Sequence, residues 1–235
     1  MLLIKNNVAF VKSMDQIATF VDECNVHFTE DGLKIIAFDN AQIIYLEYEL
    51  SKDAIEGELP SAIFGINIVE FNKIISKINS QDKLYLEVED NSLEIIIKGS
   101  YDRTFSFPQK IIDEKELSIQ LGDYPVKLEA NADILKDVFN CARVVSDSIV
   151  FDCKSNNIDI CAEGIYGKYK TQLPASTAVN FKAKFSAIHL GNMLKNASNE
   201  TKIEIKLRNS GEVMLVSSQD ALNTILELKN KLLKM

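Results

Sequence analysis

Hydrophobic residues recur three or four positions apart in four segments of the chain. The four stripes are Phe10, Met14, Ile17 and Val21; Phe71, Ile74, Ile75 and Ile78; Ile134, Leu135, Val138, Phe139 and Ala142; and Leu190, Met193, Leu194 and Ala197. Side chains at this spacing share one face of an α-helix. We therefore expect four amphipathic helices, each with one buried face.

Between these helices, hydrophobic and polar residues alternate, which predicts short antiparallel strands. A hairpin is expected to turn at 30–32, with a further turn at 39–40. Further strands are expected near 83–89, 93–98, 102–107, 148–153, 157–162, 166–173, 202–207, 212–217 and 222–228. Four helices against many short strands predict an α+β protein.

The two halves of the chain repeat the same order of elements. Residues 71–97 can be laid over 190–216 at a constant offset of 119, and a fainter match relates 10–39 to 135–164 at an offset of 125. Such a repeat predicts two similar domains, 1–108 and 125–235, joined by an unmatched linker at 109–124. Duplication also favours a symmetric assembly.

Composition narrows the class of protein. The chain is 46% hydrophobic and 26% charged, as globular domains are. We find no apolar run near the roughly 20 residues that span a bilayer, and no pattern of a secretion signal. The four cysteines form no CxxC pair, which fits a reducing compartment, so a cytoplasmic protein is expected, or a nuclear one if the source is eukaryotic. His27 and His189 lie at no ligand spacing, and neither a metal nor another cofactor is expected.

Charge gives a mixed signal about nucleic acid. The net charge of −8 by itself argues against a phosphate-rich partner. The polar sides of the four expected helices nevertheless carry cations: Lys12, Lys73, Lys77, Lys136, Arg143 and Lys195. These residues are either ordinary solvated lysines and arginine or a surface that faces phosphates, and their spacing alone leaves both interpretations open.

Motifs for catalysis are missing from the sequence. It contains no Gly-rich phosphate loop, no HExxH and no GxSxG. Paired acids such as Glu87 and Glu89 alternate along one strand face, as solvated sheet residues do. We therefore expect a protein that is not an enzyme, with a duplicated α+β enzyme as the less favoured alternative.

Three segments resemble DNA sliding clamps of the proliferating cell nuclear antigen family. They are VDECNVHFTEDGLKIIAFDNAQIIYLEYEL, FGINIVEFNKIISKINSQDKLYLEVED and the stretch from Ile149 to Gly164. The resemblance covers essentially the whole chain in order, and the short linker favours an archaeal source. It implies the DNA-clamp fold, with helices lining the hole of a three-subunit ring and antiparallel sheets outside. It also implies a processivity factor that tethers DNA polymerase and other replication and repair enzymes to duplex DNA.

The resemblance also assigns roles to residues. The six helix cations would face DNA in the hole. The subunit interface would join Asp102, Arg103 and Phe105 of one chain to Tyr166, Lys168, Tyr169 and Lys170 of the next. A pocket for a short peptide motif of polymerase, clamp loader, flap endonuclease or ligase would draw on Phe38, Ile43, Tyr45, Leu117, Ile119, Leu121 and Leu226.

The C-terminus departs from the family. Members typically end in Leu-Ala-Pro and a basic residue, whereas this chain has Thr224 to Lys229 and continues to Met235. The departure leaves open a homotrimer or a heterotrimer that includes this chain as a specialised or checkpoint-like subunit. No membrane partner is expected.

Overall fold

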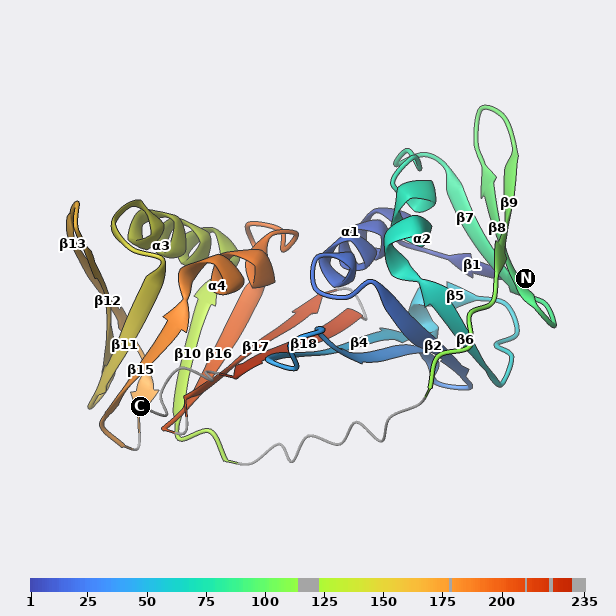
Figure 1. Cartoon of the computed structure of the whole chain (residues 1–235). Helices are drawn as coiled ribbons and strands as arrows, with labels where there is room; N and C mark the ends of the chain where they lie inside the picture. The colour runs from blue at the N-terminus through green and yellow to red at the C-terminus, as the bar shows by residue number, and fades with distance from the viewer. Residues whose placement is uncertain (114–122, 178, 210, 220–221, 230–235) are drawn as a thin grey trace. The chain divides into compact units, whose positions relative to one another are not determined.

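The structure is a computed structural model of the 235-residue chain, described at 1–113, 123–177, 179–209, 211–219 and 222–229, with side chains at 218–219 and 222–229 excepted. The chain divides into two compact units (Figure 1). Unit 1 comprises Met1–Asn40, Leu46–Ser118 and Gln219–Thr224; unit 2 comprises Ala41–Tyr45, Ile119–Ser218 and Ile225–Met235. Apart from the short segments Ala41–Tyr45 and Gln219–Thr224, the division follows the order of the sequence.

Unit 1 places two helices beside antiparallel sheets. In chain order its elements are β1 (Leu2–Ile4), α1 (Asn7–Ala18), β2 (Glu23–Thr29), β3 (Gly32–Phe38), β4 (Ile44–Ser51), the 3₁₀ turn η1 (Lys52–Ala54), β5 (Ile55–Glu56), β6 (Ala62–Asn67), α2 (Ile68–Ile75), β7 (Lys83–Val88), β8 (Ser92–Lys98) and β9 (Arg103–Pro108). One sheet has the order β5-β1-β7-β8-β9, and the other contains the run β4-β3-β2-β6.

Unit 2 repeats this plan. Its elements are β10 (Val126–Asn131), α3 (Ala132–Val145), β11 (Ser148–Lys154), β12 (Asn157–Gly164), β13 (Gly167–Pro174), β14 (Ser176–Thr177), β15 (Phe181–Ser186), α4 (Ala187–Leu194), β16 (Lys202–Arg208) and β17 (Glu212–Gln219), followed by β18 (Leu222–Lys229). One sheet has the order β13-β12-β11-β15, and the other contains the run β14-β10-β16-β17.

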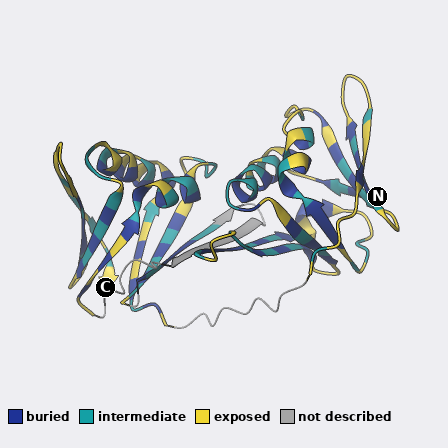
Figure 2. Ribbon diagram, viewed as in Figure 1, coloured by how far each residue is buried: buried dark blue, intermediate teal, exposed yellow. Residues whose placement is uncertain are grey.

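Each core lies between the helix pair and the sheets (Figure 2). In unit 1 the rings of Phe10 and Phe71 join α1 to α2, with centroids 6.5 Å apart and planes at 84°. In unit 2 Phe139 of α3 meets Phe151 of β11 at 6.4 Å. Full burial of such a ring stabilises the fold by about 1.5–3 kcal/mol. The predicted stripes therefore hold the helices on the sheets.

The second and fourth helices begin and end at matched positions. Asn67 and Ser186, which are 119 residues apart, cap them, and their side chains accept hydrogen bonds from Glu70 N at 2.9 Å and His189 N at 3.4 Å. The expectation that α2 carries Ile78 and Lys77 is wrong, because α2 ends at Ile75. After it, Lys77 N and Ile78 N each bond three residues back, which tightens the last turn.

Several strands lie outside the sequence prediction. β6 and β15 run directly into α2 and α4, while β1 and β10 run toward α1 and α3. β15 alternates buried Phe181, Ala183 and Phe185 with exposed lysines, a period that the connection through Pro174 obscured. Cys153 is buried, whereas Cys161 is partly exposed. Among the described residues, no helix is long and apolar enough to cross a membrane.

Candidate nucleic-acid interface

The six predicted DNA-facing cations lie on the four helices or just past their ends. Lys12, Lys73, Arg143 and Lys136 lie on α1, α2 and α3. Lys77 and Lys195 follow the last residues of α2 and α4. All are exposed except Lys136, which is half-buried. Within each unit, the cations therefore stand on the helix layer, away from the strands that carry many of the acids.

Lys73 and Lys136 each have a partner within their own unit. The Lys73 ammonium lies 2.6 Å from Glu70 Oε1, in an exposed pair on α2 that water and salt screen. The Lys136 ammonium donates to the main-chain oxygen of Ala197 at 2.6 Å and so links α3 to the turn after α4. Lys73 is therefore available to phosphates at small cost, whereas Lys136 also has a structural role.

Gly191 of α4 lies beside Arg143 of α3. A Cβ at this position would lie 3.7 Å from Nη1 of Arg143 on α3. This distance is an ordinary van der Waals contact, so an alanine side chain would also fit where α3 and α4 pack together.

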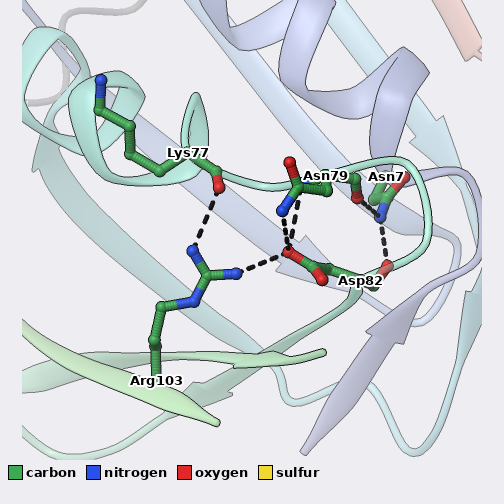
Figure 3. Close-up of polar contacts among 5 residues, drawn as sticks. All are labelled: Asn7, Lys77, Asn79, Asp82 and Arg103. Atoms are coloured by element: carbon green, nitrogen blue, oxygen red, sulfur yellow. Dashed lines mark hydrogen bonds and ion pairs between the residues drawn. The ribbon is translucent and has the colours of Figure 1, made fainter. Parts of the chain in front are cut away.

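A polar cluster holds the segment that joins α2 to β7 (Figure 3). The Asp82 carboxylate accepts hydrogen bonds from Asn79 N at 3.0 Å and from Arg103 Nη2 at 2.6 Å. Arg103 Nη1 donates to the main-chain oxygen of Lys77 at 3.1 Å, and Asn7 Nδ2 donates to that of Asp82. The Asn79 amide and then the Arg103 guanidinium hold the pKa of Asp82 below its usual value. The carboxylate is thus kept charged in a site that is largely closed to solvent.

Strands β9 and β13, which carry the predicted interface residues, lie at the ends of their sheets as described. Asp102 and Phe105 are exposed beside and on β9, and Tyr166 is 82% exposed at the turn before β13. Arg103 differs, because its guanidinium is directed into its own unit. The other predicted residues lie on β13: Lys168, which pairs with Glu163 at 2.8 Å, the half-buried Tyr169, and Lys170.

An ion-pair network ties β13 to its sheet. Asp159 of β12 is buried and lies 3.2 Å from the Lys170 ammonium and 2.7 Å from that of Lys154. Gln172 Nε2 also donates to its carboxylate at 2.8 Å. These donors, Lys154 first, lower the pKa of Asp159. The edge strand is therefore fixed in register by charge as well as by its main-chain ladder.

The predicted peptide-pocket residues are only partly within the described structure. Phe38 ends β3 and is half-buried, Ile43 is half-buried just before β4, and Tyr45 is buried in β4. Leu117, Ile119 and Leu121 lie outside the described residues, as does the side chain of Leu226. The pocket stays a prediction.

Comparisons with known sequences find similarity to sliding clamps. Residues 2–115 match the family model of the N-terminal domain of proliferating cell nuclear antigen. A DNA polymerase sliding clamp of Pyrococcus furiosus is 28% identical over 222 residues, which are 85% of each chain. DNA polymerase sliding clamp 1 of Thermococcus kodakarensis is 35% identical over 159 residues, which cover 64% of this chain and 63% of the relative.

Solved structures share the fold at lower identity. Proliferating cell nuclear antigen of Thermococcus kodakaraensis matches with a TM-score of 0.89 and 20% identity, over 97% of this chain and 99% of that one. A chain of a PCNA2–PCNA3 complex from Sulfolobus tokodaii matches with a TM-score of 0.88 and 20% identity, over 98% and 99%. The expected clamp fold is confirmed, and the chain belongs to the proliferating cell nuclear antigen family of DNA polymerase sliding clamps.

Proposed function

We propose that this chain is a subunit of a ring that encircles duplex DNA and tethers DNA polymerase, and other replication and repair enzymes, without chemistry of its own. The observation that carries the proposal is the twice-repeated pair of helices on antiparallel sheets, in a chain similar to archaeal sliding clamps along most of its length. A cytoplasmic location, close to the nucleoid, fits that role.

The DNA contact rests on Lys12, Lys73, Lys77, Lys136, Arg143 and Lys195. Cations on the helix layers attract phosphates whatever the base sequence, and the attraction falls steeply with salt because counterions are released. Lysine suits a sliding contact because its ammonium is a flexible point charge. The excess of acids elsewhere in the chain confines the attraction to the helices.

Ring closure rests on the edges of two sheets. Pairing β9 of one subunit with β13 of the next would satisfy the main-chain groups that both edges leave unpaired. Asp102, Phe105 and Tyr166 are exposed beside or on those strands, so their side chains are accessible to a second subunit. The proposal predicts a trimer, measured by native mass spectrometry, and a strictly monomeric chain that also refuses sister subunits would contradict it.

A heterotrimer that includes this chain as a specialised or checkpoint-like subunit is the second candidate. It is favoured by the atypical C-terminus from Thr224 to Met235, where the family's docking segment differs. The Sulfolobus tokodaii structure contains two different clamp chains, although at 20% identity it supports the fold alone. A trimer that forms only after sister clamp subunits are added would select this candidate, and failure to raise polymerase processivity would select the checkpoint-like form.

The DNA-facing surface is tested by retention on closed circular against linear DNA across a range of salt. A variant with Lys12, Lys73, Lys77 and Arg143 changed to Ala is expected to leave circles sooner. The slope of log retention against log salt should fall by about three to four for each copy of the chain in the ring, since each phosphate contact contributes about 0.9. Lys136 is spared because its change would also remove the bond to Ala197.

The matched control changes four cations that lie off the helices, Lys52, Lys98, Lys127 and Lys202, and so alters net charge equally. It is expected to retain DNA nearly as the unchanged protein does. Equal loss in both variants would mean that the helices do not face DNA.

A further inference from the structure

The position of Lys77 depends on a residue distant in sequence. Lys77 lies in the segment 76–82 that joins α2 to β7, with its side chain exposed. Its main-chain oxygen accepts a hydrogen bond from Arg103 Nη1 at 3.1 Å, across from β9. Figure 3 shows the Lys77 ammonium extending away from this bond. Arg103 therefore holds the backbone from which a proposed DNA-facing cation projects.

Arg103 is itself held by an ion pair that is closed to solvent. Its Nη2 lies 2.6 Å from Asp82 Oδ2, and the two side chains are only 17% and 6% exposed. A Cβ on Gly99, in the turn between β8 and β9, would overlap the Asp82 carboxylate. The turn is thus packed onto the pair, and a pair away from water is less screened than one at the surface.

The same carboxylate holds the rest of the segment. It accepts hydrogen bonds from the Asn79 main-chain nitrogen at 3.0 Å and from the Asn79 side chain at 3.4 Å. The main-chain oxygen of Asp82 accepts from Asn7, the first residue of α1. The segment after α2 is therefore fixed at Lys77, at Asn79 and at Asp82, and the Asp82–Arg103 pair connects all three points.

We propose that the Arg103–Asp82 ion pair positions Lys77 toward the DNA backbone, with Arg103 acting inside its own subunit. This inference rests on the proposed function, and specifically on Lys77 facing DNA. Arg103 and Asp82 are positioning residues, since neither needs to touch a phosphate. Through one guanidinium, the edge strand proposed for ring closure also sets the geometry of the DNA-facing surface.

The change Asp82→Asn distinguishes a positioning role from an effect of net charge, because the two predict opposite changes in retention on DNA. Removing an acid near DNA should strengthen retention if only net charge matters. If Asp82 positions Lys77, the change should instead weaken retention on closed circles by about threefold at moderate salt, as the loss of one phosphate contact would. Lys77→Ala should have the same effect, and the double variant should be no weaker than either single variant.

Glu70→Gln is the matched control. It removes an equal charge from the same helix region, but Glu70 contacts only Lys73 among the six cations. It should leave retention unchanged or lengthened. Arg103→Lys keeps the positive charge but loses the two-pronged contact with Asp82 and Lys77. It should weaken retention like Asp82→Asn, while native mass spectrometry still shows the same assembly as the unchanged protein.

Five results would overturn the inference, the last of them together with the proposed function. Tighter retention by Asp82→Asn would show that net charge decides, and additive losses in the double variant with Lys77→Ala would show that Asp82 does not act through Lys77. Loss of the ring in folded Arg103→Lys would show that Arg103 acts across the subunit boundary. If Lys77→Ala alone has no effect while the other helix cations matter, the inference fails and the proposed function stands; if no helix cation matters, both fail.

Discussion

The turns after α2 and α4 hold the same backbone with different chemistry. At the offset of 119, Asn79 and Asp82 correspond to Ser198 and Thr201. In each turn the fourth residue donates its main-chain N–H to the oxygen of the first, at 3.0 Å in both cases. The side chains differ: Asp82 forms a closed ion pair with Arg103, whereas the hydroxyls of Ser198 and Thr201 lie 2.6 Å apart and share a hydrogen bond.

Both turns also reach the first residue of the neighbouring helix. The main-chain oxygen of Asp82 accepts from the Asn7 side chain, while that of Thr201 accepts from the main-chain nitrogen of Ala132 at 2.8 Å. The duplicated turn is therefore set by its backbone, and its side chains were free to diverge. We therefore expect the charged copy, but not the neutral copy, to respond to acid.

The largest expected effects come from buried core residues at matched positions in the two halves of the chain. Phe71 and Leu190 occupy matched positions and are 2% and 0% exposed. We expect Phe71→Ala to lower the free energy of unfolding by about 3–5 kcal/mol and Leu190→Ala by about 2–5 kcal/mol, through lost burial and the cavities left behind. Urea unfolding measures both losses. A loss below about 1 kcal/mol in either variant would mean that the matched residues do not play the same part in the two cores.

The second prediction concerns the side chains that differ between the two turns. Thr201→Ala removes the neutral hydroxyl that shares a hydrogen bond with Ser198, and this should cost about 1 kcal/mol of unfolding free energy. Asp82→Ala should cost more, because it leaves the largely covered Arg103 guanidinium without its counter-ion. Calorimetric melting of the two variants measures the difference. Equal melting temperatures would mean that the ion pair adds nothing over the hydroxyl pair.

The third prediction concerns the stability of the protein at low pH. The pKa of Asp82 is lowered in the folded protein, so its contribution is present above the unfolded value of about 3.9 and is lost as pH falls through the folded value. Asp152 and Asp159 act in the same direction. The unchanged protein should therefore lose stability below about pH 4, and Asp82→Asn should lose less over that interval. Parallel stability curves for Asp82→Asn and the unchanged protein would refute the role of this carboxylate.

The smallest expected effect comes from a surface pair. Glu70 and Lys73 form an i, i+3 pair at 2.6 Å, but their side chains are 55% and 64% exposed. Glu70→Ala should change the free energy of unfolding by only about 0.3 kcal/mol, and less in high salt. Urea unfolding at two salt concentrations checks this. A loss as large as that of Asp82→Ala would mean that solvent exposure does not separate the two pairs.

The sequence predicted the elements that depend on local periodicity. The stripes through Phe10, Phe71, Phe139 and Leu190 locate all four helices because burial imposes a period of 3.6 residues. The ends of α1, α2 and α4 were misplaced, because the apolar stripes continue to Val21, Ile78 and Ala197 beyond the last helical residues. β6 was missed because its burial pattern breaks the alternation expected of a strand.

The site was harder to predict than the fold. Asp82 and Arg103 are 21 residues apart and meet only because β7, β8 and β9 pair in register. Asn7 is 75 residues from Asp82 in sequence. Polar residues in a turn carry no period, so a cluster built from three separate segments leaves no local sequence signal. The resemblance assigned Arg103 to the subunit interface, and that assignment stays a prediction.

The free edge of β13 has a consequence for the newly synthesised chain. A strand at the end of a sheet offers its N–H and C=O groups to any passing strand, including the wrong one. Along β13 the exposed Lys168 and Lys170 stand at alternate positions, each paired with an acid of the neighbouring strand β12. Such lysines act as gatekeepers against aggregation during synthesis, so the charges that fix this strand in its own sheet also protect the chain until it finds its partners.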